Sequence, residues 1–196
     1  MGNELQYFVV YKPFGMISQF SESGDKPTLA SLYDFEKDIY PVGRLDTDSE
    51  GMLILTNDSS LNQKLLNPSN KQSKTYWVQV EGEPTQEAIA ALNKGVEISI
   101  KGKKHHTAPA KAEIINPENL PERNPPIRFR KNVPTTWISL TITEGKNRQV
   151  RRMTAKVGYP TLRLIRVNIG TLKFDKLEPN AVRSYSKKEF YQILNI

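Results

Sequence analysis

The stretch of the chain that gathers acidic side chains is the first place to look for chemistry. Residues 43–58 read GRLDTDSEGMLILTND and place Asp46, Asp48, Glu50 and Asp58 around an apolar run, although the whole chain carries a net charge of +7. Three interpretations fit such a pattern. It could be a calcium-binding loop, a polar turn next to a strand, or a catalytic carboxylate held among cations.

A calcium loop of the EF-hand type fits this stretch only in part. Asp46, Asp48 and Gly51 match positions one, three and six of that loop. The twelfth position should be a glutamate that gives two oxygens to the ion, but here it is Asn57, and an apolar strand rather than a helix follows Gly51. The pattern therefore argues against calcium and leaves the turn and the catalytic carboxylate open.

Basic residues are concentrated in one part of the chain. Between Arg123 and Lys173 there are 12 Lys and Arg and one acid, Glu144, so this segment of 51 residues carries +11 while the other 145 carry −4. An asymmetry of this kind favours a polyanionic partner over a face that is merely solvated. Nucleic acid is the expected partner.

The composition excludes several classes of protein. The 196 residues suit one domain or two small ones, and the absence of cysteine excludes disulfide and thiol chemistry. No apolar run approaches the roughly 18 residues that cross a bilayer, and the N-terminus lacks the pattern of a signal peptide. We expect a cytoplasmic protein with no membrane segment.

The elements that must position these residues form a sheet with a few helices. Strands are expected at 7–11, 52–55, 74–80, 96–100, 110–115, 136–143 and 162–169, and helices at 85–93, 147–157 and about 186–196. Strands outnumber helices and do not alternate with them regularly. The sequence therefore predicts an α+β fold on a largely antiparallel, mixed sheet flanked by helices, with 1–196 as a single domain that has room for two subdomains sharing one sheet.

Capping residues set the expected ends of the helices. Thr85 should cap the first helix and Gly95 end it, while Asn147 should cap the second. Ser186 and Glu189 form a capping box for the last one.

Two irregular segments are also expected. Residues 101–104 read as a polar turn between strands, and His105 and His106 beside it are expected in an exposed loop, because the pattern offers no third metal ligand. Residues 116–134 carry five prolines and several cations, so they read as a long loop with a functional role.

Five motifs in order along the chain resemble one known family. They are Lys12-Pro13-Phe14-Gly15, the stretch 43–58, Lys74-Thr75-Tyr76, residues 144–153 (EGKNRQVRRM) and residues 164–170 (LIRVNIG). Together they resemble the RsuA/RluB/RluE/RluF family of ribosomal RNA pseudouridine synthases. Residues 123–128 and 133–137 look most like the RluE type, which acts on large-subunit (23S) rRNA.

The resemblance implies a fold and a reaction. The fold would be the pseudouridine synthase catalytic fold, with no N-terminal S4-like domain because the first motif already begins at residue 12, so targeting would lie within the catalytic domain. The reaction would isomerise a specific uridine of 23S rRNA to pseudouridine, using a flipped-out base and neither a cofactor nor a metal.

The resemblance also implies roles for individual residues. Asp46 would be the catalytic residue, paired with Arg151, which is expected just over one turn into its helix. Tyr76 would carry the target base on its ring, and Arg44 would fill the gap left by the extracted nucleotide. Apart from the resemblance, positive charge makes six residues candidates for contacts with RNA phosphates: Lys12, Lys146, Arg148, Arg152, Arg163 and Arg166.

The expected partner is large-subunit ribosomal RNA. No protein partner is implied, and a monomer is the default expectation. A second hypothesis keeps the fold but not the chemistry, as a non-catalytic RNA-binding or ribosome-assembly module. It predicts that loss of the Asp46 carboxylate has no effect, whereas charge reversals at Arg148 and Arg152 do.

Overall fold

The structure is a computed structural model that describes residues 4–128, 130–173 and 178–196. The chain divides into two compact units, a first unit of Met1–Gln72 with Val167–Ile196 and a second unit of Ser73–Arg166. Among the described residues, helices are too short or too polar to cross a membrane.

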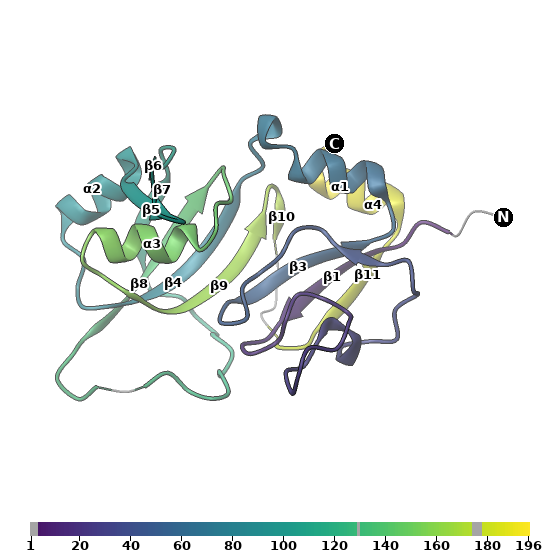
Figure 1. The fold of residues 1–196 in the computed structure, drawn as a ribbon, viewed down its shortest axis with the longest axis horizontal. Coiled ribbons are helices and arrows are strands. Elements are labelled where there is room, and N and C mark those ends of the chain that lie inside the picture. The colour runs from purple at the N-terminus through teal and green to yellow at the C-terminus, as the bar shows by residue number, and fades with distance from the viewer. Residues whose placement is uncertain (1–3, 129, 174–177) are drawn as a thin grey trace. The chain divides into compact units, whose positions relative to one another are not determined.

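The first unit is built on an antiparallel sheet. Strand β1 (Tyr7–Lys12) lies between β3 (Glu50–Thr56) and β11 (Val182–Tyr185). The short strand β2 (Tyr40–Pro41) pairs with the last two residues of β3 on the edge opposite β1. Strand β10 (Leu172–Lys173) pairs with the last residues of β9 (Thr161–Ile169), which begins in the second unit and ends in the first. Every residue of β1 and β3 is buried, because both faces of this sheet are covered (Figure 1).

Apolar side chains from alternate positions of β1 and β3 build the core on one face. Phe8 and Val10 pair in register with Leu55 and Leu53 and pack against buried Leu29, with Met16 and Ile39 in the same cluster. Leu29 opens a short 3-10 helix, Leu29–Ser31. Alternation places one residue set on each face of a strand, so Tyr7 points to the opposite face.

Two helices cover that opposite face. Helix α1 (Ser59–Leu66) is followed by a 3-10 turn at Pro68–Asn70, and α4 (Lys187–Leu194) ends the chain. The ring of Phe190 stacks on that of Tyr7 with centroids 5.4 Å apart. Figure 1 shows α1 and α4 side by side, and Tyr191 of α4 donates a hydrogen bond to Asp58, the N-cap of α1.

The second unit holds a three-stranded antiparallel sheet in the order β4–β8–β7. These strands are Lys74–Glu81, Thr135–Ile142 and Lys111–Ile115. Alternate residues of β4 are buried, as expected for a strand with one face on the core. Helices α2 (Gln86–Lys94) and α3 (Gln149–Lys156) contribute buried apolar residues, and a separate hairpin joins β5 (Glu97–Ile100) to β6 (Lys103–His106).

The α+β fold with a largely antiparallel sheet is confirmed, and so are most of the expected strands. Thr85 caps α2, Gly95 ends it, and both halves of the capping box at Ser186 and Glu189 are present.

Three local expectations are wrong. The strand at 96–100 pairs with 103–106, which had been read as a turn and a loop, rather than with 110–115. Asn147 does not cap α3: the N-cap is Arg148 in a left-handed conformation (φ 50°), and its side chain makes no capping hydrogen bond. Helix α1 was not expected at all, although Asp58 caps it by accepting hydrogen bonds from the backbone N–H groups of Ser60 and Leu61.

Candidate active site and RNA-binding residues

Asp46 lies in the loop that precedes β3 in the first unit. Its backbone carbonyl accepts a hydrogen bond from Ser49 N–H at 3.0 Å, which closes a turn, and its side chain is half-buried. Strand β3 then begins at Glu50, which is buried and accepts a hydrogen bond from the hydroxyl of Tyr11 at 3.2 Å. A strand at this point and an inward-facing Glu50 do not fit an EF-hand, so the calcium interpretation fails on geometry as well.

The segment that carries the first motif holds the Asp46 loop in place. The hydroxyl of Ser18 donates to the carbonyl of Leu45 at 2.8 Å and accepts from Leu45 N–H at 3.1 Å. Gly15 N–H donates to the carbonyl of Thr47 at 2.8 Å. The backbone on both sides of Asp46 is therefore fixed by residues 15–18.

Lys12 belongs to the same segment, but its ammonium group points inward. The side chain is fully buried, and Nζ donates to the carbonyls of Pro13 at 3.0 Å and Met16 at 2.8 Å. These bonds shape the turn that ends at Ser18. A phosphate contact needs an exposed donor, so we leave Lys12 out of the proposed RNA contacts.

Arg44, unlike Lys12, has an exposed side chain. The next residue, Leu45, is buried among the core residues of the first unit. This difference in burial agrees with the expectation that the two side chains point to opposite sides. Its guanidinium is therefore available to an RNA that approaches the loop.

Tyr76 lies on β4 in the second unit and is buried, with 8 % of its surface exposed. Lys74, two residues earlier, shares its strand face. Burial, and then the positive charge of Arg166, lowers the pKa of the Lys74 ammonium. Arg166 itself is buried, and we leave it out of the proposed phosphate contacts for that reason.

Arg151 is the third residue of α3 and therefore lies in the first turn, earlier than the sequence predicted. It is half-buried, and its Nη1 lies 3.5 Å from the carbonyl oxygen of Thr161, where β9 begins. The hydroxyls of Thr154 and Thr161 are 2.7 Å apart, which ties the same helix to the same strand. This double attachment sets the position of the Arg151 side chain.

The other predicted cations of the second unit separate into two groups. Lys146 and Arg148 are exposed on the loop before α3. Arg163 is buried and donates to the carbonyl of Pro121 at 2.9 Å, so it anchors the proline-rich segment to β9. Arg152 is half-buried, and its guanidinium donates hydrogen bonds to the backbone carbonyls of Asn147 and Ser99.

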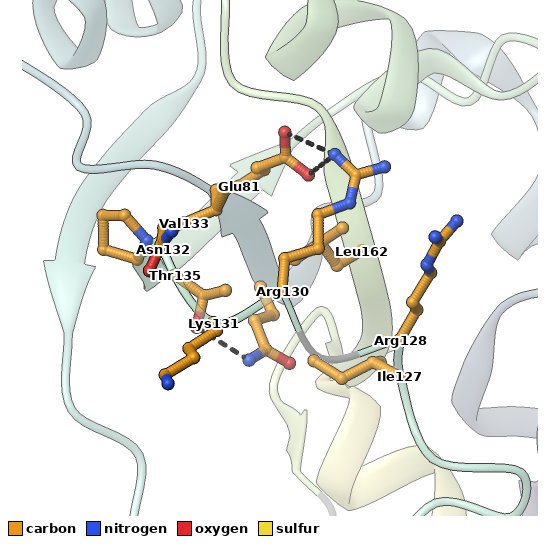
Figure 2. A pocket seen from close by; sticks show the side chains of 11 residues that line it. Glu81, Ile127, Arg128, Arg130, Lys131, Asn132, Val133, Thr135 and Leu162 are labelled. Carbon is orange, nitrogen blue, oxygen red and sulfur yellow. Dashed lines mark hydrogen bonds and ion pairs between the residues drawn. The ribbon is translucent and has the colours of Figure 1, made fainter.

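A pocket of about 550 Å³ lies beside the proline-rich segment of the second unit. Figure 2 shows its walls, which come from residues 127–128 and 130–135, the end of β4 and Leu162. On one side of the pocket, Nη1 of Arg130 donates hydrogen bonds to both carboxylate oxygens of Glu81, at 3.2 and 3.0 Å. The residues predicted for catalysis do not line this pocket, so we do not place the reaction there.

The sequence predicted a loop for His105 and His106, but both residues lie in strand β6. His105 Nε2 lies 3.1 Å from a carboxylate oxygen of Glu144. Within the described part of the chain, no group of three or more His, Cys, Asp or Glu could hold a metal ion.

The predicted catalytic residues therefore sit on fixed local scaffolds in both units. Asp46 and Arg44 lie before β3 in the first unit, while Tyr76 and Arg151 lie on β4 and α3 in the second. The family model described as RNA pseudouridylate synthase matches residues 6–156, which include all four. The chain belongs to this family.

Similar proteins agree with this assignment. A protein of Vibrio parahaemolyticus named Ribosomal large subunit pseudouridine synthase E is 51 % identical over 168 residues, which cover 86 % of this chain and 68 % of that protein. A protein of the same name from Xanthomonas axonopodis pv. citri is 51 % identical over 171 residues, 86 % of this chain and 87 % of its own. A solved structure titled as a pseudouridylate synthase superposes with a TM-score of 0.78 at 30 % identity and covers 97 % of this chain and 74 % of that one.

Two residues that shape the site were missed from the sequence. Ser18 follows the first motif by three positions, and nothing in its type or spacing distinguishes a buried hydroxyl that binds backbone from an exposed one. Gln149 lies inside the fourth motif but was overlooked beside four cations. The structure shows that its buried side chain organises the loop before α3.

Proposed function

We propose that this protein isomerises a uridine of large-subunit ribosomal RNA to pseudouridine, with Asp46 as the catalytic carboxylate. One observation carries the proposal. A chain about half identical to proteins named for this activity keeps Asp46 in a loop whose backbone is fixed on both sides.

The reaction moves one bond of the nucleotide. The bond between ribose C1′ and base N1 breaks, the base turns, and a bond from C1′ to C5 forms. C5 loses a proton and N1 gains one, so neither composition nor oxidation state changes. We propose that a carboxylate beside the sugar and base is sufficient for this chemistry, as nucleophile or as base, and that no cofactor takes part.

We propose that Tyr76 and Arg151 also take part in the reaction. An aromatic face holds a flipped base by stacking and does not prevent it from turning, which the isomerisation requires. A guanidinium near a carboxylate favours its charged form. Arg151 and Arg152 occupy the first turn of α3, which holds no acid. Cations at this end of a helix are disfavoured by about 0.3–1 kcal/mol each, a cost that a carboxylate or phosphate nearby would offset.

Arg44, Lys146 and Arg148 are the proposed first contacts with RNA, because their side chains are exposed. We propose that Arg44 fills the place of the extracted nucleotide, since a planar guanidinium stacks on neighbouring bases. Large-subunit rRNA as substrate favours action in the cytoplasm, and we propose that the protein acts there as a monomer.

The alternative of a non-catalytic RNA-binding module is less well supported. A protein that only binds RNA gains nothing from a carboxylate held rigidly where a polyanion must approach. The names of the similar proteins also refer to catalysis.

The test compares wild type with Asp46→Asn on an unmodified transcript of 23S rRNA. Wild type should produce pseudouridine at a specific position, and Asp46→Asn should produce none above background while its affinity for the transcript is retained. Asp25→Asn, at an exposed site of the same unit, is the matched control and should act like wild type. Full activity of Asp46→Asn, or no pseudouridine with wild type, would refute the proposal.

A further inference from the structure

The hairpin of β5 and β6, residues Glu97–His106, carries exposed positive charge that the function described so far does not use. Lys101, Lys103 and Lys104 are all exposed around its turn. Glu97 lies 3.1 Å from Lys104 and offsets that charge only. We call residues 97–106 the basic hairpin.

One face of the basic hairpin is fixed to the loop before α3 through Glu144. One oxygen of this carboxylate lies 3.1 Å from His105 Nε2, and the other accepts from Ala108 N–H at 2.9 Å and from the side-chain amide of Gln149 at 2.6 Å. Lys103 shares the strand face of His105 because side chains alternate along a strand. Lys103 therefore lies on the side of the hairpin that faces Glu144.

The loop itself is fixed by the same residues. The Gln149 side-chain oxygen accepts a hydrogen bond from the backbone N–H of Lys146 at 3.0 Å. The guanidinium of Arg152 spans both segments, since Nη1 donates to the carbonyl of Ser99 on β5 at 2.6 Å and Nε donates to the carbonyl of Asn147 at 3.1 Å. Figure 1 shows β5 next to α3, in agreement with these bonds.

The exposed cations of the two segments consequently form one surface of fixed shape. Lys101, Lys103 and Lys104 belong to it from the hairpin, and Lys146 and Arg148 from the loop. Holding like charges together is unfavourable in the free protein. The side chains of Glu144, Gln149 and Arg152 nevertheless bind the two segments to each other. A polyanion would remove that repulsion and would release counterions on binding.

We infer that the basic hairpin is a second RNA-binding element, which contacts the phosphate backbone together with the loop 145–148. The inference rests on the proposed function only in taking RNA as the partner. Apart from Glu97 and Ser99, the exposed residues of the hairpin and the loop are Lys, Arg, His, Asn and Gly. The cores of protein interfaces, in contrast, are poor in Lys and rich in aromatic residues. This composition favours phosphate groups over a protein partner.

The test measures binding of unmodified 23S rRNA transcript over a series of salt concentrations. In the double variant Lys101→Gln/Lys103→Gln, the slope of log affinity against log salt should become shallower by about 1.4–1.8, which corresponds to two lost phosphate contacts. Lys94→Gln/Lys111→Gln removes the same charge from exposed sites of the same unit and should leave the slope unchanged. An unchanged slope in the hairpin variant would overturn the inference.

A charge-preserving variant tests the connection between the two segments. Arg152→Lys keeps the charge but cannot donate to Ser99 and Asn147 from a planar fork. The slope should become shallower here as well, because the hairpin is no longer held beside the loop. A wild-type slope in Arg152→Lys would refute the role of Arg152 in joining them.

The same samples separate this inference from the proposed enzyme. Pseudouridine formed by wild type with equal slopes in all variants would leave the enzyme standing and remove the second binding element. A shallower slope in the hairpin variants with no pseudouridine from wild type would support the second binding element and refute the proposed enzyme.

Discussion

Ser18 holds both backbone groups of Leu45, the residue before Asp46. A single hydroxyl donates to the carbonyl oxygen at 2.8 Å and accepts from the N–H at 3.1 Å, and both residues are buried. A buried polar group without a partner costs about 1–3 kcal/mol, so removal of this hydroxyl would favour a shift of the loop. The geometry of the carboxylate therefore depends on a side chain that does not touch the substrate.

Ser18→Ala should lower kcat for pseudouridine formation by about 10–100-fold and change KM much less, because small misplacements of a catalytic group are costly while most of the proposed RNA contacts lie on other segments. Ser18→Thr keeps the hydroxyl and should recover part of the loss. Ser31→Ala, which also removes a 2.8 Å hydroxyl-to-carbonyl bond in the same unit, is the control and should have wild-type kinetics. Equal kinetics of Ser18→Ala and wild type would show that Ser18 does not position the loop.

Two replacements of Tyr76 should distinguish the role of its ring from the role of its hydroxyl. Tyr76→Phe should keep most of the activity, because the proposed contact with the base is a stacked ring. Tyr76→Leu should lose about 1–3 kcal/mol of stacking, measured as a fall in kcat/KM of about 5–150-fold. Circular dichroism and melting curves would verify that both variants are folded, and equal losses in both would argue against stacking.

Asp58 should make stability depend on pH in the acid range. Burial alone would raise the pKa of its carboxyl group, but hydrogen bonds from Ser60, Tyr7, Tyr191 and Leu61 N–H lower that pKa well below its ordinary value. A carboxylate with a depressed folded-state pKa stabilises the fold above its unfolded pKa of about 4 and loses this effect as the pH falls further. The free energy of unfolding should therefore decrease as the pH is lowered from about 5 towards 2.

Asp58→Asn should reduce this pH dependence and lower stability at neutral pH by about 2–3 kcal/mol, because the amide has only one acceptor atom for donors that approach both oxygens. Denaturant titrations at several pH values measure both effects. Asp34→Asn, at an exposed site, should keep the wild-type curve. An Asp58→Asn profile parallel to that of wild type would rule out this carboxylate as the source.

Gly95→Ala should destabilise the protein for two reasons. Gly95 has φ of 91°, a conformation that favours glycine, and an added Cβ would overlap the backbone carbonyl oxygen of Thr107. Backbone cannot move aside as a flexible side chain can, so we expect a loss of about 2 kcal/mol or more. Gly145→Ala meets nothing within 4 Å and should melt within a few degrees of wild type.

Much of the fold could be predicted from local signals. The alternation in 136–143 and the aromatic, β-branched run at 74–80 each correspond to a strand, because such patterns match a surface that is half-buried. The caps at Thr85 and Ser186 were found because their acceptors satisfy N–H groups a few residues away. Interactions within one turn of chain leave a clear pattern in sequence.

The errors arose where the decisive partner is distant. Residues 103–106 (KKHH) are polar and show no strand pattern, yet they pair with 97–100. Their tertiary contact, between His105 and Glu144, is 39 residues away in the sequence. Asn147 looks like a cap, but its side-chain oxygen accepts from Arg152 and its neighbour Arg148 takes the N-cap position. Asp58 joins residues 51 and 133 positions away, which no local window contains.

Some residues of the candidate site could likewise be predicted from local sequence signals, and others could not. Asp46, Tyr76 and Arg151 could be named because motifs carry them, and exposure of Arg44 followed from alternation with Leu45. Lys12, Arg163 and Arg166 were placed among the phosphate contacts by charge alone, and burial could not be read from charge. Which cations are exposed depends on the tertiary packing around each one.

The division of the first unit into Met1–Gln72 and Val167–Ile196 has a consequence for biosynthesis. A ribosome releases the chain from its N-terminus, so β1 and β3 emerge long before β11 and α4. At about 5–20 residues per second, the roughly hundred intervening residues impose a delay of several seconds. During that interval Ser73–Arg166 is free to fold, whereas the carboxylate of Asp58 gains its hydrogen bond from Tyr191 only after that segment has been translated.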